Sequence, residues 1–264
     1  TLGSVTAADI INVEVYKERL FFVLKDSLTY GYLPVNAVAG TVASVNLGSV
    51  FSKGGKIMAI ATWTRDGGAG PDDNILFFTD QGEIAMYSGT DPSDATKWGL
   101  VGVYTVGRPI GHRCMLKVGS DCYLVTENGL LPMTQVLGTG EAAPNVALSD
   151  KISSSYNSSV VEFKGTFGWQ GVVYPKGGYA AVNAPASTVG DFIQYIINLE
   201  TGAWSRFTNQ DAYVWAVFNS DLYFGGSTKV YKADSGTDDS GSAIEAVAKT
   251  AFIYFGGRNG PKRY

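Results

Sequence analysis

Histidine and cysteine are scarce in this sequence of 264 residues. The single histidine, His112, excludes a metal site built from several histidines. Two cysteines are too few for a disulfide framework. Apolar runs are short as well, and none approaches the roughly 18 residues that a membrane-spanning helix needs. We therefore expect no membrane span.

Charge is also low and slightly acidic. Charged residues make up 17% of the chain, and 20 lysines and arginines against 24 acidic residues give a formal net charge of −4. This balance provides no overall basic field for nucleic acid. Residues 256–264 are locally basic and rich in glycine, with Arg258, Lys262 and Arg263. We interpret this segment as a solvated terminal stretch that leads into sequence beyond this chain.

Glycine and aromatic residues, in contrast, are abundant. The chain has 33 glycines, and aromatic residues account for 12% of it. Glycine provides the backbone conformations of tight turns, and aromatic residues favour strands. With 45% hydrophobic residues, the chain also has enough material for a core. The composition predicts an all-β protein with many turns.

Short apolar or alternating runs recur along the chain, and turn signals such as Glu127-Asn128-Gly129 end them. Only two short helical turns are expected, at residues 91–96 and 149–155. The clearest predicted strands are residues 19–24, 56–63, 75–79, 83–87, 113–118, 122–126, 171–174, 193–198, 214–218 and 222–225.

One pattern repeats: an aromatic-rich strand, a turn and a second strand. Its leading positions are Leu20, Leu76, Tyr123 and Leu222, spaced by 56, 47 and 99 residues. The last spacing is about two periods. Units of roughly 45 to 57 residues with about four short strands have the size of a propeller blade.

We therefore predict a β-propeller of about five four-stranded antiparallel blades over residues 1–255, with under about 10% helix. Trp98 and Trp204 each open the strand after a hairpin, where we expect them to fill the wedge between adjacent sheets. A jelly roll or a stack of sandwiches is the alternative, but it would not explain the repeated order of elements. The expected blades are residues 11–55, 56–108, 109–157, 158–208 and 209–255.

The two cysteines flank a predicted two-residue turn, Gly119-Ser120. Such a turn pairs Lys117 with Cys122 and leaves Cys114 opposite Val125. The two thiols would then lie too far apart to form a disulfide. We expect two buried, reduced cysteines.

Candidate catalytic residues are few. We interpret His112 as a polar residue at a strand edge rather than as the partner of Cys114 in a catalytic pair. The acidic pairs Asp72-Asp73 and Asp238-Asp239 lack the alternating spacing of a calcium loop, so we interpret them as structural or solvated. The sequence thus predicts no catalytic, cofactor-binding or metal-binding residue and no cofactor.

Several glycine-punctuated segments resemble those of tailed-phage virion proteins. The likeness spans nearly the whole chain. The segments are similar to those of the propeller-bearing tail proteins of short-tailed bacteriophages, namely the tail nozzle and the DNA-stabilising tail hub. The segments are residues 47–55 (LGSVFSKGG), 67–73 (GGAGPDD), 87–92 (YSGTDP), 107–111 (GRPIG), 167–170 (FGWQ), 201–207 (TGAWSRF) and 250–256 (TAFIYFG).

This resemblance implies a non-enzymatic virion structural protein, a component of a phage tail through which DNA passes during ejection. It also implies other tail proteins as partners, assembly in the host cytoplasm, and a homo-oligomeric ring formed by the full-length protein. We expect the ring-building surfaces to lie largely beyond this chain, which alone would be a stable monomer or a weak oligomer. Because the chain is acidic, any contact with DNA would be a passing one.

A second class of function stays open. Many propeller enzymes cleave sugars, so the alternative function is a carbohydrate-binding or carbohydrate-cleaving propeller, that is, a receptor reader, a glycosidase or a lyase. Such a protein would gather acids, arginines and tyrosines from several blades into one deep pocket. A structural module would instead show scattered polar residues there and apolar patches on its outer rim or ends.

Overall fold

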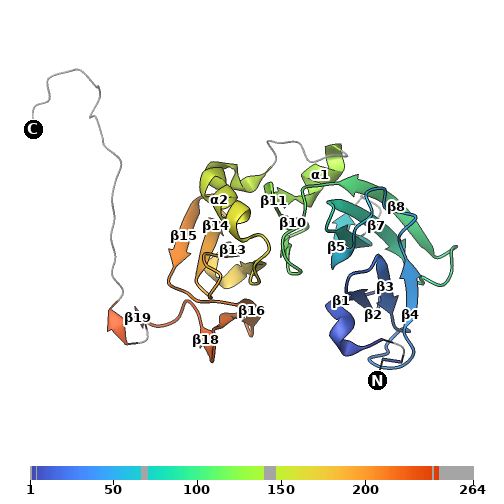
Figure 1. Cartoon of the computed structure of the whole chain (residues 1–264), viewed down its shortest axis with the longest axis horizontal. Helices are drawn as coiled ribbons and strands as arrows, with labels where there is room; N and C mark the ends of the chain where they lie inside the picture. Colours follow the sequence, from blue (N-terminus) through green and yellow to red (C-terminus); the bar gives the residue numbers. More distant parts are fainter. Residues whose placement is uncertain (1, 4, 67–70, 140–146, 240, 244–264) are drawn as a thin grey trace, which may run out of the picture. The chain divides into compact units, whose positions relative to one another are not determined.

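The computed structural model describes residues 2–3, 5–66, 71–139, 147–239 and 241–243. The chain forms two compact units, Thr1–Ala233 and Asp234–Tyr264. The first unit contains five antiparallel sheets that follow one another in chain order, from blue to orange-red in Figure 1. These sheets are the blades of a β-propeller, so the predicted fold class is confirmed.

Within the described ranges, three blades are four-stranded sheets whose strands pair in sequence order. Blade 1 contains β1 (Ile10–Tyr16), β2 (Arg19–Leu24), β3 (Thr29–Tyr32) and β4 (Ala43–Asn46), preceded by the 3-10 helix η1 (Ala7–Asp9). Blade 2 contains β5 (Ile57–Asp66), β6 (Pro71–Thr79), β7 (Glu83–Gly89) and β8 (Trp98–Thr105). Blade 4 contains β12 (Gln170–Tyr174), the 3-10 helix η3 (Pro175–Gly177), β13 (Tyr179–Pro185), β14 (Phe192–Asn198) and β15 (Trp204–Thr208).

The other two blades have three strands each in the described part of the chain. Blade 3 contains β9 (Met115–Val118), β10 (Asp121–Thr126) and β11 (Gly129–Pro132), and blade 5 contains β16 (Val214–Phe218), β17 (Asp221–Gly225) and β18 (Val230–Lys232). In blade 3 the chain passes from β11 directly into helix α1 (Met133–Thr139). The Asp121 carboxylate accepts hydrogen bonds from the backbone N–H of Thr134 (3.1 Å) and from its hydroxyl (2.6 Å). This carboxylate satisfies a free N–H at the start of α1 and stabilises the helix where other blades continue as a strand.

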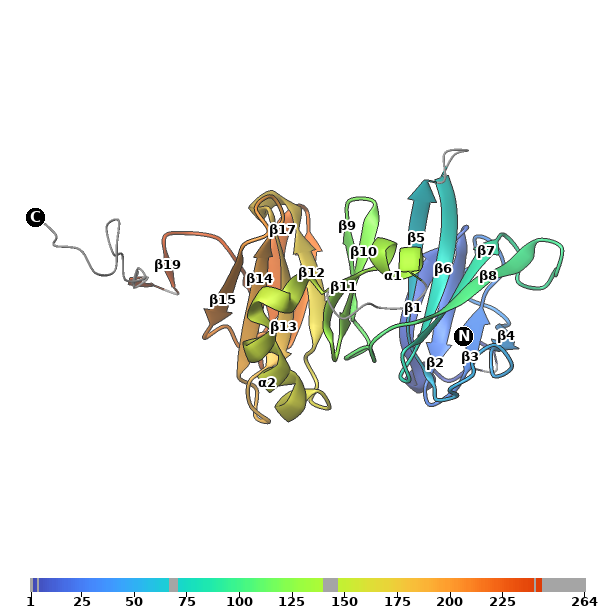
Figure 2. The ribbon, with the colours of Figure 1, turned by 90° about the horizontal axis from the view of Figure 1, so that it is seen from above.

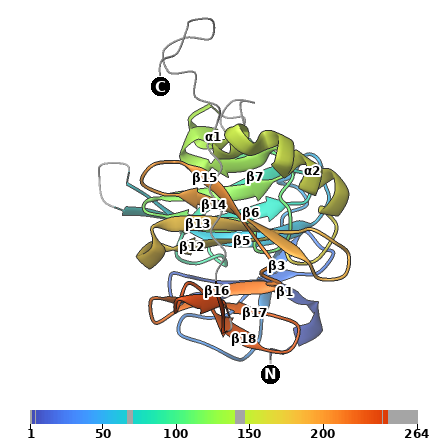
Figure 3. The same cartoon turned by 90° about the vertical axis from the view of Figure 1, so that its left-hand side faces the viewer.

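Helix α2 (Ser153–Phe163) follows the 3-10 helix η2 (Leu148–Ile152) and is longer than the helical turn expected at residues 149–155. It crosses the expected blade boundary between residues 157 and 158. Its serine-rich sequence has weak intrinsic helix propensity. Packing stabilises it, because Tyr156 and Val160 lie one turn apart and are both buried in the core. Figures 2 and 3 show α2 lying against the sheet of blade 4.

The described α-helices are short, with 7 residues in α1 and 11 in α2, in line with the low helix content expected. None of the described helices is long and apolar enough to cross a membrane. The second unit contains a pair of two-residue strands, β19 (Asp238–Asp239) and β20 (Ser242–Ala243). The expected domain end at residue 255 and the basic segment 256–264 lie outside the described residues.

The hydrophobic core lies between successive blades. Blades 1 and 2 share one cluster, blades 2, 3 and 4 share a second, and blades 4 and 5 share a third. Representative buried members are Phe21, Tyr30 and Phe77 in the first cluster, Leu76, Leu124 and Val182 in the second, and Ile196, Trp215 and Leu222 in the third. Burial of apolar surface between sheets therefore holds the blade series together.

The repeated hairpin marks equivalent strands of different blades. Its leading positions Leu20, Leu76, Tyr123 and Leu222 lie in β2, β6, β10 and β17, which are the second strands of their sheets. The turn between β16 and β17 has positive φ at both central residues, Asn219-Ser220, as a tight hairpin of this kind requires.

The wedge-filling role predicted for tryptophan at the start of a blade's last strand is confirmed for Trp98. Trp98 is the first residue of β8 and Trp204 is the first residue of β15. The ring of Trp98 stacks on Phe21 of blade 1 (5.8 Å between ring centroids) and on Tyr87 of its own blade (5.6 Å). It therefore fills the wedge between the first two sheets.

Candidate functional site

First strands of neighbouring blades contact each other at three places in the series, and β5 also contacts β10, the second strand of blade 3. β1 packs against β5, β9 against β12, and β12 against β16. In a propeller these inner strands surround the central axis, where a ligand or a channel is found. Polar side chains on them are therefore the candidate functional residues.

Three polar side chains from three blades meet on these inner strands: Glu14 of β1, Thr62 of β5 and Lys117 of β9. Glu14 Oε1 accepts hydrogen bonds from the Thr62 hydroxyl (2.9 Å) and from Lys117 Nζ (3.2 Å). The Lys117 ammonium also donates to the Thr62 hydroxyl oxygen. The cluster neutralises its own carboxylate and connects three blades.

A second cluster between blades 1 and 2 contains Asp73 of β6, one residue of the predicted acidic pair, together with Lys17 of the turn after β1 and Thr64 of β5. Its carboxylate forms an ion pair with Lys17 and accepts a hydrogen bond from the Thr64 hydroxyl (2.9 Å). The hydrogen bond from Lys17, and then that from Thr64, hold the pKa of Asp73 below its usual value. The backbone oxygen of Asp73 also accepts a bond from the Tyr16 hydroxyl (2.7 Å). Asp73 is therefore a paired, ionised carboxylate and is poorly suited to donate a proton.

Among the remaining acidic residues that the sequence singled out, Asp238 is the one whose side chain the structure describes. Asp238 is exposed, and its Oδ1 accepts a hydrogen bond from the backbone N–H of Gly241 (3.0 Å) beside the β19–β20 pair. The side chains of Asp72 and Asp239 are outside the described part of the structure. Among the described residues, no group of three or more His, Cys, Asp or Glu side chains is placed to hold a metal ion.

His112 and the cysteines have separate partners. The Nδ1 atom of His112 lies 2.9 Å from the backbone oxygen of Met58, so the ring bonds to main chain and not to a thiol. Lys117 pairs with Cys122 across the predicted turn, and both cysteines are buried and free, as expected. Burial raises the pKa of Cys114, and also of Cys122, to about 12. Both thiols therefore stay protonated and unreactive near neutral pH.

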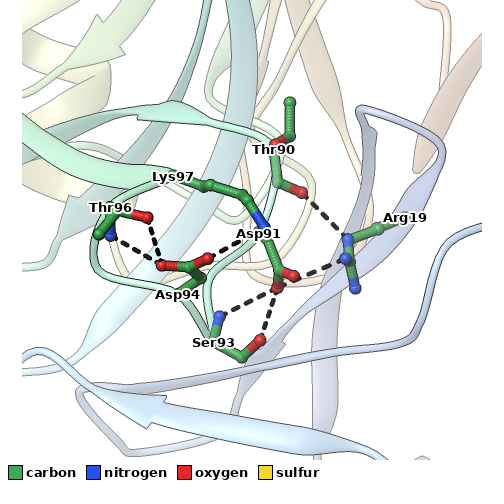
Figure 4. A network of polar contacts seen from close by, with 7 residues as sticks. All are labelled: Arg19, Thr90, Asp91, Ser93, Asp94, Thr96 and Lys97. Carbon is green, nitrogen blue, oxygen red and sulfur yellow. Dashed lines mark hydrogen bonds and ion pairs between the residues drawn. The ribbon is translucent and has the colours of Figure 1, made fainter.

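The loop between β7 and β8 binds to blade 1 through Arg19, as Figure 4 shows. Arg19 Nε donates to the backbone oxygen of Thr90 (3.2 Å), and its Nη2 lies 3.4 Å from Asp91 Oδ1. The same Asp91 oxygen accepts bonds from the backbone N–H (3.1 Å) and the hydroxyl (2.7 Å) of Ser93. These bonds, that from the Ser93 hydroxyl first, lower the pKa of Asp91.

The prediction of a helical turn at residues 91–96 is wrong, because this loop consists of turns closed by aspartate side chains. Asp94 accepts bonds from the backbone N–H (2.9 Å) and hydroxyl (2.6 Å) of Thr96, which together with Lys97 lower its pKa to about 2. Such side-chain bonds to nearby N–H groups compete with helix formation. Gly89 begins the loop with φ +128°, where an added Cβ would lie 1.9 Å from the Lys97 carbonyl oxygen.

A buried amide network joins blades 4 and 5. The side-chain oxygen of Asn183 accepts bonds from Gln194 Nε2 (2.8 Å) and Trp215 Nε1 (3.0 Å), and its amide nitrogen donates to two backbone carbonyls. Gln170 exchanges two hydrogen bonds with the main chain of Trp215, at 2.7 and 2.9 Å. Asn183 is fully buried, so this network is part of the core and not a surface site.

The sequence singled out Asp73 but none of its partners, and it gave no sign of the cluster of Glu14, Thr62 and Lys117. Glu14 is 48 residues from Thr62, Thr62 is 55 residues from Lys117, and Lys17 is 56 residues from Asp73, so no local pattern marks these pairs. The aspartate turns do have a local signal, since Asp91 and Asp94 are each followed two residues later by a serine or threonine.

No protein-family model and no curated protein sequence matches this chain. Among solved structures, the WD40 domain of SCAP from fission yeast is similar over 84% of this chain, with 10% sequence identity and a TM-score of 0.34. The match covers 55% of that structure, so the chain spans about half of its length. The blade topology described above, and not this likeness, defines the chain as a β-propeller.

Proposed function

We propose that this chain is a non-enzymatic structural protein of a phage tail, of the nozzle or hub type, through which DNA passes during ejection. It would be assembled in the host cytoplasm beside other tail proteins, act in the virion, and form a homo-oligomeric ring in the full-length protein. The sequence resemblance motivates the proposal. The observation that carries it is the mutual pairing of charges between blades, by Glu14 with Lys117 on the inner strands and by Lys17 with Asp73 beside them.

In an enzyme or a sugar-binding propeller, acids from several blades would stay free to converge on a ligand. Here Glu14 is paired with Lys117, and Asp73 is paired with Lys17. Each pair joins residues of different blades, so these charges connect the sheets. This use of charge supports a structural role.

The outer strand of blade 2 adds support. The sequence of β8, WGLVGVYT, has no charged residue, and Leu100, Val101 and Val103 are exposed on it. Exposed apolar side chains on one strand fit contact with neighbouring proteins better than catalysis.

The charges paired between blades also suit passing DNA. A protein grips DNA mainly by presenting lysine and arginine to phosphates. Because Lys17 and Lys117 already face carboxylates, they offer little net positive charge to a polyanion. DNA would then move past this surface without being held.

Genetics of a phage that encodes this chain tests the proposal. An amber codon placed in the gene should give particles that assemble heads, lack part of the tail in negative-stain micrographs, and lose infectivity in a non-suppressing host. A suppressing host should restore both. Normal, infectious particles in the non-suppressing host would contradict the proposal.

A glycan-binding panel and a hydrolysis assay test the alternative. We expect no binding and no sugar release by the purified chain. Binding or cleavage that scales with protein concentration and is lost in Glu14→Gln would favour the carbohydrate function instead.

A further inference from the structure

Blade 1 begins the series of blades, and it shares an apolar cluster with blade 2 through one of its two faces. Tyr16 and Phe21 belong to this shared cluster. On the other side, Phe22, Leu33 and Val42 form a separate small cluster within blade 1. Blades 2 and 4, in contrast, each take part in two clusters that are shared with other blades. Blade 1 therefore has a small core of its own in addition to the one that it shares.

Charged side chains of blade 1 also reach residues outside it. In the described part of the chain, four ion pairs do so: Glu14 with Lys117 of blade 3, and Lys17 with Asp73, Arg19 with Asp91, and Asp26 with Lys56, all three on or beside blade 2. Lys17 lies in the turn after β1 and Asp26 in the turn after β2, so the pairs hold both ends of the blade.

These four ion pairs are in contact with solvent. The side chains of Asp26 and Lys56 are 60% and 43% exposed, and even the most covered of the eight, Arg19, is 13% exposed. Dissolved ions screen the attraction between exposed charges. Each such pair contributes little by itself, but the four act on the attachment of the same blade. Salt should therefore weaken this attachment at several points at once.

The other joints of the series depend less on exposed charge. Blades 2, 3 and 4 are joined through one large apolar cluster. Blade 5, at the other end, is joined to blade 4 by an apolar cluster, by the buried amide of Asn183 and by one described ion pair between blades, Lys176 with Asp221. Salt does not screen apolar contacts, and buried polar groups are screened much less than exposed ones.

In a series of repeats, each unit is held mainly by its neighbours, and a terminal unit can open while the others stay folded. We infer that blade 1 is a separable end unit whose attachment to blades 2 and 3 is controlled by salt, so that it opens locally while blades 2 to 4 stay folded. Blade 1 opens in this way whatever the partners of the chain are, so the inference does not rest on the proposed function.

Hydrogen exchange of the 264-residue chain, read by mass spectrometry of peptides, tests the inference. Exchange is compared at one pH in about 0.05 M and about 1 M sodium chloride, between which the Debye length falls several-fold. We expect peptides from β1 to β3 to exchange at least about fivefold faster at high salt. Peptides from β16 to β18 should respond less, and those from β10 and β13 should not change. Equal acceleration in all blades, or none in blade 1, would overturn the inference.

Two variants separate the ion pairs of blade 1 from general effects of salt. The double variant Lys17→Gln with Lys117→Gln removes one pair to blade 2 and the pair to blade 3. Its blade 1 should exchange faster at low salt and lose about half of the salt response, because two of the four pairs are gone. The matched control Lys164→Gln removes an exposed pair with Glu127, between the end of α2 and the β10–β11 turn, and should behave like the native chain. A full salt response in the double variant would overturn the inference.

Discussion

Two joints between neighbouring blades are filled by different kinds of side chain. One joins blades 1 and 2, and the other joins blades 4 and 5. The first is filled by aromatic rings, with Phe21 stacked on Trp98, and is closed at its surface by Arg19 and Asp91. The second is built around the buried amide of Asn183 and the indole of Trp215. The topology of a propeller therefore requires a filled wedge but does not prescribe what fills it.

The difference has consequences for stability. The aromatic joint depends on close packing, and its ionic closure responds to pH and salt. A buried amide network has no titrating member, but each missing partner leaves a polar group unpaired. Substitutions in the two joints should therefore separate packing, hydrogen-bond and charge effects.

The largest effect is expected from Phe21→Ala in the aromatic joint. Phe21 is fully buried and contacts the rings of Tyr16, Tyr30, Tyr32 and Trp98. Truncation leaves a cavity and should lower the free energy of unfolding by about 3–5 kcal/mol in urea denaturation. Phe167→Ala is the matched control, since Phe167 is largely exposed and its loss should be minor. Equal losses in the two variants would contradict the packing described.

Asn183→Leu in the amide joint should follow. Leucine has a similar volume but leaves Gln194 Nε2 and Trp215 Nε1 without their shared acceptor. We expect a loss of about 1–3 kcal/mol in the free energy of unfolding. The same measurement on Asn157→Leu, an exposed asparagine of α2, should show little change. A neutral or stabilising Asn183→Leu would mean that the network is not formed.

Glu83→Gln should remove a pH-dependent contribution to stability near the joint of blades 1 and 2, of a kind that the amide joint lacks. Burial raises the pKa of the Glu83 carboxyl, but bonds from the Ser52 hydroxyl and the backbone N–H groups of Lys53 and Ser52 outweigh it, so the pKa is lowered. A lowered folded-state pKa stabilises the fold above the unfolded-state pKa, and this contribution is lost as pH falls through the folded-state pKa. Glu83→Gln should therefore cost about 1 kcal/mol at pH 7 and progressively less in acid. Thermal melts over pH 3–7 measure this, and a pH-independent difference would be the contrary result.

Arg19→Ala should have a smaller effect. Its partner Asp91 is at the surface, and exposed ion pairs contribute little to stability. We expect a slight decrease in the denaturation midpoint that shrinks further at high salt, with Arg19→Lys intermediate. A loss as large as that of Asn183→Leu would show that the surface closure matters more than the amide network.

His112→Ala should have the smallest effect. Its ring contacts a backbone oxygen and lies in neither joint. Phage infectivity and the unfolding midpoint should both match the native protein within error. Loss of infectivity with unchanged stability would show that His112 has a functional role of its own.

The sequence predicted the parts of the fold that depend on local pattern. Turn residues and apolar alternation located β2 and β16 at their observed bounds, and the Gly119-Ser120 turn gave the register of Cys122. Helix α2 was underestimated because its serines disfavour a helix, and only packing of Tyr156 and Val160 stabilises it.

The candidate site was less accessible to prediction. Glu14 and Lys117 are 103 residues apart, and their meeting depends on how whole blades pack. Neither residue belongs to a motif, so composition and spacing could not predict that the two side chains would pair. Sequence reasoning could predict scattered polar residues on the inner strands, but not which of them would pair.

Electron cryomicroscopy of tails from a phage that encodes this chain would show whether the chain is a structural propeller in a ring of copies. Several copies should surround the tail axis, with the ion pairs of Glu14 with Lys117 and of Lys17 with Asp73 intact. A particle without the chain, or with a single copy whose inner strands hold a bound sugar, would contradict this expectation.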